Sequence, residues 1–170
     1  MATKRAQLDL SGLAQADLEA ELATLAAHLN AGTCRWLELV GELDRRSGWA
    51  DAGLRSCDEW IAWRCALTPR SAREHVRVAR GLRELPLTHA AFASGELSYA
   101  KVRALTRVAT PANEQELLGL ARACTASQLE RVVRAYRRVT VEEAREQGLT
   151  NEDAVEVMCR FVASADTVRT

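Results

Sequence analysis

Four arginines recur three and four residues apart in one short stretch of the sequence. Arg70, Arg73, Arg77 and Arg80 follow Pro69. At about 100° per residue in an α-helix, their side chains fall within an arc of roughly 80°. A guanidinium group can bind a phosphate, or donate two parallel hydrogen bonds to a guanine base. The spacing therefore predicts a basic helix face that contacts DNA, unless these arginines are simply solvated.

The charge of the chain is unevenly distributed along its 170 residues, although the formal net charge is zero. Residues 1–68 carry a net charge of −3, residues 69–138 carry +7, and residues 139–170 carry −4. A cationic block between acidic flanks is typical of a surface that binds a polyanion. A solvated arginine-rich face would give the same pattern.

Two short helices with a tight corner between them would have to position the arginine row. Ser56 and Glu59 have the spacing of a capping box that starts the first helix, and Thr68 is suited to cap the second. Ala66 stands at the corner, where a helix-turn-helix usually has glycine. The region 56–85 thus fits a helix-turn-helix with one departure, and the alternative is two core helices joined by a corner.

A second stretch, "FASGELSYAKVRAL", has a similar design. Gly95 is predicted to cap one helix in the left-handed conformation, and Ser98 to start the next. The second tier of predicted nucleic-acid contacts lies there: Tyr99, Lys101, Arg103 and Arg107. A third cluster, "RVVRAYRR", places Arg131, Arg134 and Arg138 at helical spacing. If the three faces align, they form a groove that could follow a duplex backbone.

The remaining pattern predicts a mainly α fold, a multi-helix bundle with helix-turn-helix-like corners and a short C-terminal strand. Residues 1–150 are expected to form the helical domain, with further helices that start at Thr110, Thr125 and Thr140 and end at about 148. Alternating apolar residues at 154–162 predict the strand, within a tail at 151–170 that resembles the start of another region.

A long amphipathic stretch at about 13–46 comes first in this bundle. Its apolar residues recur three and four apart, beginning with Leu18, Leu22, Leu25 and Leu29. They predict one long helix, or two with a break at "NAGT". We expect the stripe to pack within the chain; a dimer seam is the alternative.

No pattern typical of catalysis or metal binding is present in the sequence. The five cysteines include no CxxC pair, the three histidines are scattered, and no phosphate-binding glycine loop or nucleophile motif occurs. We therefore expect no catalytic residue, metal or cofactor. Without an apolar leader or an 18-residue apolar run, the protein is expected to be cytoplasmic and not membrane-bound.

The motifs "LTPRSA", "LRELP", "ASGELSYAKVRAL" and "ATPANE" together resemble the family called domain of unknown function 222. The similarity covers residues from about 50 to 138, with a weaker match in the long first helix. Members of this family characteristically precede an HNH endonuclease module, often in mobile or repeated genes. The resemblance implies a helical module that works with a nuclease, supplied either by a following region or by a partner chain.

Two functions follow from these patterns, and an enzymatic activity within these residues is the least favoured third. The first is a non-catalytic helical module that binds double-stranded DNA and positions an HNH nuclease on it. The alternative is a protein–protein interaction or homodimerisation module, with the long first helix as the seam and no affinity for nucleic acid.

Overall fold

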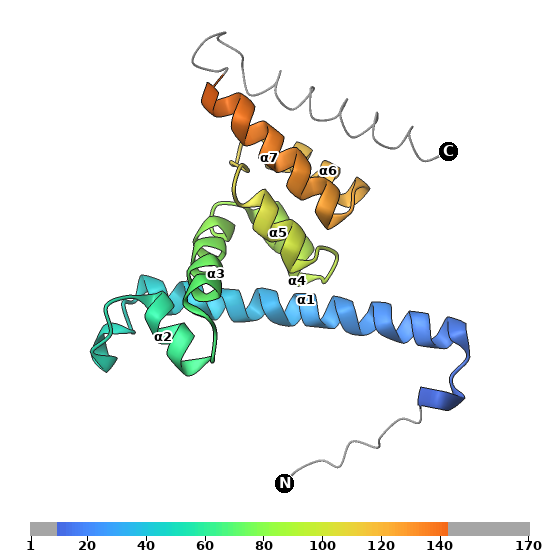
Figure 1. Ribbon diagram of the computed structural model, residues 1–170, viewed down its shortest axis with the longest axis horizontal. Coiled ribbons are helices and arrows are strands. Elements are labelled where there is room, and N and C mark those ends of the chain that lie inside the picture. The colour runs from blue at the N-terminus through green and yellow to red at the C-terminus, as the bar shows by residue number, and fades with distance from the viewer. Residues whose placement is uncertain (1–9, 143–170) are drawn as a thin grey trace.

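The computed structural model describes residues 10–142, with side chains as far as residue 137. This part of the chain is all helical, which confirms the mainly α prediction, and the tail predicted as a strand lies outside it. Two 3-10 helices, Leu10–Gly12 and Ala50–Ala52, flank the first of seven α-helices (Figure 1). The α-helices are α1 (Gln15–Arg45), α2 (Cys57–Arg64), α3 (Pro69–Leu82), α4 (Pro86–Ala93), α5 (Tyr99–Leu105), α6 (Glu114–Ala123) and α7 (Ala126–Glu142).

Helix α1 is one unbroken helix of 31 residues that continues through the "NAGT" sequence. At 1.5 Å per residue it is about 46 Å long. All of its buried residues lie in the C-terminal half, at Cys34, Leu37, Val40 and Gly41. Figure 1 shows the N-terminal half running out past the other helices. The prediction that the whole stripe packs within the chain is therefore right only for the C-terminal half of α1, as far as the described residues show.

The caps at the corner between α2 and α3 form as predicted. The Ser56 hydroxyl accepts a hydrogen bond from the Glu59 amide at 3.3 Å, and the Thr68 hydroxyl accepts one from the Ser71 amide at 3.2 Å. Between the two helices, Ala66 adopts a left-handed conformation with φ of 53°. This conformation normally favours glycine, which explains why glycine is the usual residue at such a corner.

Two predicted helix starts are wrong. The residues after Thr110 form a turn, in which the Thr110 amide donates to the Asn113 side chain at 2.7 Å, and α6 begins only at Glu114. The backbone of Thr140 lies inside α7, which continues to Glu142. By contrast, Thr125 and Gln128 form the expected reciprocal capping box in front of α7.

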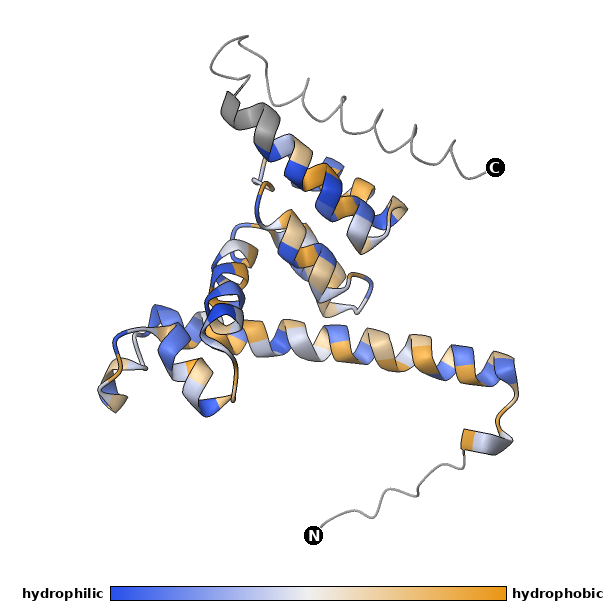
Figure 2. Cartoon of the chain, viewed as in Figure 1, coloured by the Kyte–Doolittle hydropathy of each residue, from blue (hydrophilic) through white to orange (hydrophobic). Residues whose placement is uncertain are grey.

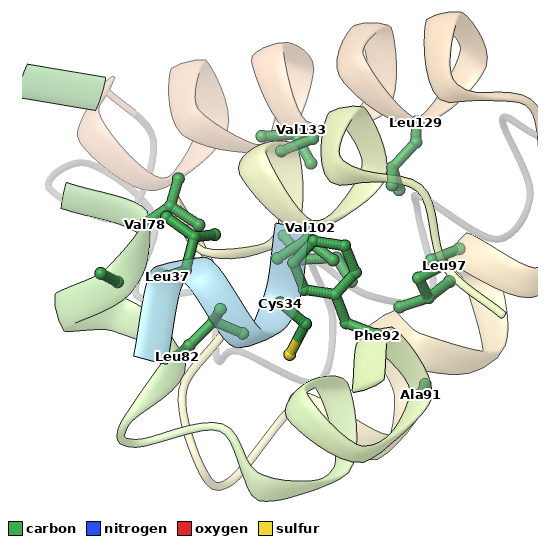
Figure 3. Packing of buried hydrophobic residues seen from close by; sticks show 14 of the residues in the cluster. Cys34, Leu37, Val78, Leu82, Ala91, Phe92, Leu97, Val102, Leu129 and Val133 are labelled. Atoms are coloured by element: carbon green, nitrogen blue, oxygen red, sulfur yellow. The ribbon is translucent and has the colours of Figure 1, made fainter. Parts of the chain in front are cut away.

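The core lies where α1, α3, α4 and α5 meet, with α6 and α7 packed on α5 (Figure 1). Phe92 of α4 is fully buried near its centre, beside Cys34 of α1 and Val102 of α5 (Figure 3). Leu129 and Val133 extend the same cluster into α7. In residues 10–142 no helix combines the length and apolar character needed to cross a bilayer.

Candidate nucleic-acid interface

Helix α3, which carries the predicted arginine row, lies in the middle of the fold. Its apolar side is buried as predicted, at Ala72, Val76, Ala79 and Leu82. It packs extensively on both α1 and α2. Its Gly81 also lies close to Thr106, the residue that follows α5. With neighbours on several sides, most of the helix has little surface left for a ligand.

Arg77 fastens α3 to α5. Its guanidinium donates to the backbone carbonyls of Arg103, at 2.9 Å, and Thr106, at 3.0 Å. It also holds Glu74 on its own helix, with the Nη2–Oε1 distance at 2.9 Å. These carbonyls lie at the C-terminal end of α5. The helix dipole favours a cation there, and the guanidinium donates hydrogen bonds to carbonyl groups that have no partner within the helix. The side chain therefore has a structural role, which sequence analysis did not predict.

Arg80 forms a two-point ion pair with Asp44 of α1. The Nε–Oδ2 and Nη2–Oδ1 distances are both 2.8 Å, the geometry of a bidentate guanidinium–carboxylate pair. The Asp44 carboxylate is largely covered, and the hydrogen bonds from Arg80 lower its pKa. Arg80 keeps an exposed side, but its donors on Nε and Nη2 are turned toward α1.

The cations of α5 are also engaged by the protein. Arg103 pairs with Glu130 of α7, and Arg107 pairs with Glu74 of α3. Lys101 donates to the backbone carbonyl of Ala121, at 2.7 Å, near the end of α6. The hydrogen bond from Arg77 and a second one from Arg107 lower the pKa of Glu74. These contacts link α3, α5, α6 and α7 into one network.

Tyr99 is not presented to solvent as a contact residue. Its ring stacks on His75 of α3, with the ring centroids 4.8 Å apart, and Trp36 of α1 meets His75 edge-on at 5.0 Å. The Tyr99 hydroxyl is buried, and burial raises its pKa to about 12. The three rings join α1, α3 and α5. No local pattern predicts this aromatic cluster, because its members are widely separated in the sequence.

Within the predicted row on α3, the two arginines of the first turn have no carboxylate partner among the described residues. Arg70 and Arg73 are exposed there, and Arg73 donates only to the backbone carbonyl of Pro69, at 3.2 Å. Nearby in sequence, Arg64 at the end of α2 lies over the ring of Trp63, 5.2 Å from its centroid. The predicted row of four is thus reduced to its two N-terminal members.

The third predicted cluster lies on α7. Arg131, Arg134 and Arg137 are exposed and have no ion pair among residues 10–137, whereas the side chain of Arg138 lies outside the described part. Glu130, which pairs with Arg103, is on the same helix. The three predicted clusters are therefore linked by ion pairs, in which Glu74 and Glu130 bind some of their arginines.

Some of these partners could be read from the sequence, and others could not. Glu74 stands three residues before Arg77, a spacing at which helical side chains meet. Asp44 and Glu130, however, come from helices 36 and 27 residues away from the arginines that they bind. No local sequence pattern predicts an ion pair between residues so far apart in the chain.

Three side chains with the chemistry of metal ligands also lie close together. One ligand atom each from Cys34, Glu38 and His89 fall within 4.8 Å of one another. The groups already bind one another: Glu38 lies 2.8 Å from His89 Nε2, and the Cys34 thiol points to the His89 carbonyl. Burial raises the pKa of this thiol to about 11, so it is protonated at neutral pH. We assign the cluster a structural role between α1 and α4.

Comparison with known proteins identifies a family for this chain. No curated protein and no solved structure matches the chain. A family model described as "Domain of unknown function (DUF222)" matches residues 14–158, which include all seven α-helices described above. Because that match spans most of the sequence, the chain belongs to the DUF222 family.

Proposed function

We propose that this protein binds double-stranded DNA with the first turn of α3, and thereby positions an HNH nuclease on the duplex. The observation that carries the proposal is the pair Arg70 and Arg73. They are the arginines of the predicted row that no carboxylate neutralises in the described structure. The nuclease would be a following module or a separate chain, as the family resemblance implies.

The place of these two arginines supports the proposal. In helix-turn-helix proteins the N-terminal residues of the second helix reach the base edges, while its remainder packs on the first helix. Here Ala66 has a left-handed backbone conformation between α2 and α3, and α3 packs on α2. The positive end of the helix dipole also favours phosphate binding at this turn. The other two arginines of the row, Arg77 and Arg80, would fix α3 against α5 and α1 and so keep its first turn in place.

The test is the double variant Arg70→Ala and Arg73→Ala in a duplex-binding titration. We expect at least about a tenfold loss of affinity at low salt, since one good arginine contact contributes about 1–3 kcal/mol. If both contacts are to phosphate, the salt dependence should also weaken, by about 0.9 in slope for each. Arg77 is left unchanged, because its removal would disturb α3 and α5 instead of testing the interface.

The matched control is Arg131→Ala with Arg134→Ala, which removes the same charge from exposed positions on α7. Its affinity should stay close to that of the unchanged protein. Equal losses in the two variants would mean diffuse charge attraction without a site on α3. Full binding by the α3 variant would refute the assignment.

The rival function, an interaction module that does not bind nucleic acid, is favoured by one specific observation. The projecting half of α1 exposes leucines at 56–63% of their full surface. This feature does not depend on the arginines, so association through α1 is tested separately from DNA binding.

A further inference from the structure

The N-terminal half of α1 carries a stripe of leucines, three of which are largely exposed. Leu22 is 60% exposed, Leu25 is 56% exposed and Leu29 is 63% exposed, and the partly buried Leu18 precedes them on the same side. Figure 2 shows hydrophobic positions recurring along the projecting helix. Isolated exposed leucines are ordinary, but a row at helical spacing is a contiguous apolar surface of the kind used for association.

This leucine stripe faces away from the body of the protein. At about 100° per residue, the four leucines lie within an arc of about 60°, and Ala27 and Cys34 lie on the opposite side of the helix. Cys34 is buried in the core, and the Ala27 backbone packs against Gly95 in the turn between α4 and α5. The body therefore holds α1 by one face and leaves the leucine face open.

The same stripe is covered where it continues toward the C-terminus of α1. Trp36 meets His75 of α3, and the Val40 carbonyl accepts a contact from the Cys57 thiol of α2 at 3.8 Å. Leu43 also packs against the core. The apolar stripe of α1 is thus covered in the C-terminal half of the helix, where α2 and α3 pack against it. In the N-terminal half these two helices no longer cover it.

We propose that the leucine stripe of α1, Leu18, Leu22, Leu25 and Leu29, pairs in antiparallel orientation with the same stripe of a second copy of this chain. The leucines are spaced four, three and four residues apart, which is the a and d pattern of a coiled coil. The spacing of four, three and four residues is the same from either end of the helix. An antiparallel copy therefore meets Leu18 with Leu29 and Leu22 with Leu25, and each leucine layer is complete.

Side-chain pairing and shape favour the antiparallel arrangement over the parallel one. Glu21 and His28 lie on the same flank of the stripe, so the antiparallel register sets the Glu21 carboxylate of one copy beside the His28 imidazole of the other, a pair that can share a hydrogen bond. In a parallel pair Glu21 would face Ala26 and His28 would face Thr33, so the carboxylate would lose this partner.

The bodies also fit this orientation. Helix α2 lies against α1 near Val40, on the side to which the stripe leads. In the antiparallel register Val40 of one copy is level with a point beyond the Gln15 end of the other helix, so the two α2 helices stay apart. A parallel pair would bring them together at the same level.

Pairing also avoids the main cost of forming a short coiled coil. An isolated helix of this length is marginally stable because its nucleus is unfavourable. Here α1 is a single helix whose C-terminal half is anchored in the core, so the projecting half is already formed when a partner arrives. The inference does not rest on DNA binding, and either can fail without the other.

The first test measures the mass of the full chain by light scattering at high micromolar concentration. We expect twice the chain mass of 18.7 kDa for the unchanged protein and a single chain mass for Leu22→Glu with Leu25→Glu. Both positions are exposed, so the circular dichroism spectrum should be unaffected apart from any loss due to dissociation. Leu87→Glu, at an exposed leucine of α4 outside the stripe, is the matched control and should remain a dimer.

The second test determines orientation by disulfide trapping, with Cys65 and Cys159 replaced by serine. Leu18→Cys and Leu29→Cys are prepared as separate proteins, mixed and oxidised. The antiparallel register predicts a mixed Leu18→Cys/Leu29→Cys disulfide and little linkage of either variant to itself. Self-linkage of each variant without the mixed product would overturn the orientation.

The mass measurement decides whether a second copy of the chain covers the leucine stripe. A monomeric unchanged chain would overturn the proposal, since the leucine stripe would then be covered by residues outside 10–142 or by another protein. A dimer that survives the double glutamate variant would also overturn it, because another surface would be responsible. DNA binding by a monomer would leave the proposed function standing.

Discussion

At the scale of single residues, the arginines of this protein divide by the partner that each one finds. Arg77 and Arg80 occupy the same helical row as Arg70 and Arg73, but the first two bind groups on other helices. A pattern of spacing predicts which side chains share a face, and here that prediction was right. It cannot tell whether a neighbouring helix supplies a carboxylate to that face, because the neighbour is chosen by the tertiary fold.

Arg77 is the residue where this distinction can be measured. Replacing it by alanine removes its hydrogen bonds to Glu74 and to the end of α5. Hydrogen bonds that involve a charge contribute about 1.5–3 kcal/mol each, and this side chain is about one third exposed, so water replaces part of them. We expect the free energy of unfolding in urea to fall by about 2 kcal/mol.

Arg70→Ala is the control for that measurement, because it removes an arginine of the same helix that has no partner among the described residues. Its unfolding free energy should change by no more than about 0.5 kcal/mol. Similar losses in both variants would mean that Arg77 is not the tether that its contacts indicate.

At the scale of elements, local signals predicted local structure. The caps at Ser56, Thr68 and Ser98 accept hydrogen bonds as expected, since a cap and its helix are only three residues apart. Thr110 and Thr140 carry similar residue patterns and fail as helix starts. The same pattern is compatible with a turn or with a helix interior, and only packing decides between them. The exposure of the leucine stripe was also beyond local prediction.

Gly95 tests how the turn between α4 and α5 holds α1. Its φ is 82°, and a Cβ atom added there would lie 2.5 Å from the Ala27 carbonyl oxygen. Gly95→Ala should therefore lower the free energy of unfolding by about 3 kcal/mol, the combined effect of backbone strain and overpacking. Thermal and urea unfolding would both report the change.

Gly53 provides a control with almost the same backbone. Its φ is 71°, but nothing lies within 4 Å of the added Cβ. Gly53→Ala should lower the unfolding free energy by only about 1 kcal/mol, from strain alone. If the two variants lose equal stability, the close contact between Gly95 and α1 contributes nothing.

At the scale of the whole molecule, carboxylates join helices that are distant in sequence. Asp44 joins α1 to α3 through Arg80, Glu74 joins α3 to α5 through Arg107, and Glu130 joins α7 to α5 through Arg103. Glu96, in the turn before α5, binds Arg122 of α6 in the same way. The cationic block of the sequence is thus partly neutralised inside the fold, which the segmental charges alone could not reveal.

These ion pairs between helices predict how the free energy of unfolding depends on pH. The pKa values of Asp44 and Glu74 are lowered from ordinary values of 3.8 and 4.5, mainly by hydrogen bonds from Arg80 and Arg77. A carboxyl whose pKa is lower in the folded state stabilises the protein fully above its unfolded pKa, and that contribution is lost as the pH falls through the folded pKa. The free energy of unfolding in urea should therefore be lower at pH 3 than at pH 5. In Asp44→Asn with Glu74→Gln it should be reduced already at neutral pH and should decline less between pH 5 and pH 3. A decline as steep as that of the unchanged protein would place the acid sensitivity in other carboxylates, and these two ion pairs would then not be what holds α3 between α1 and α5.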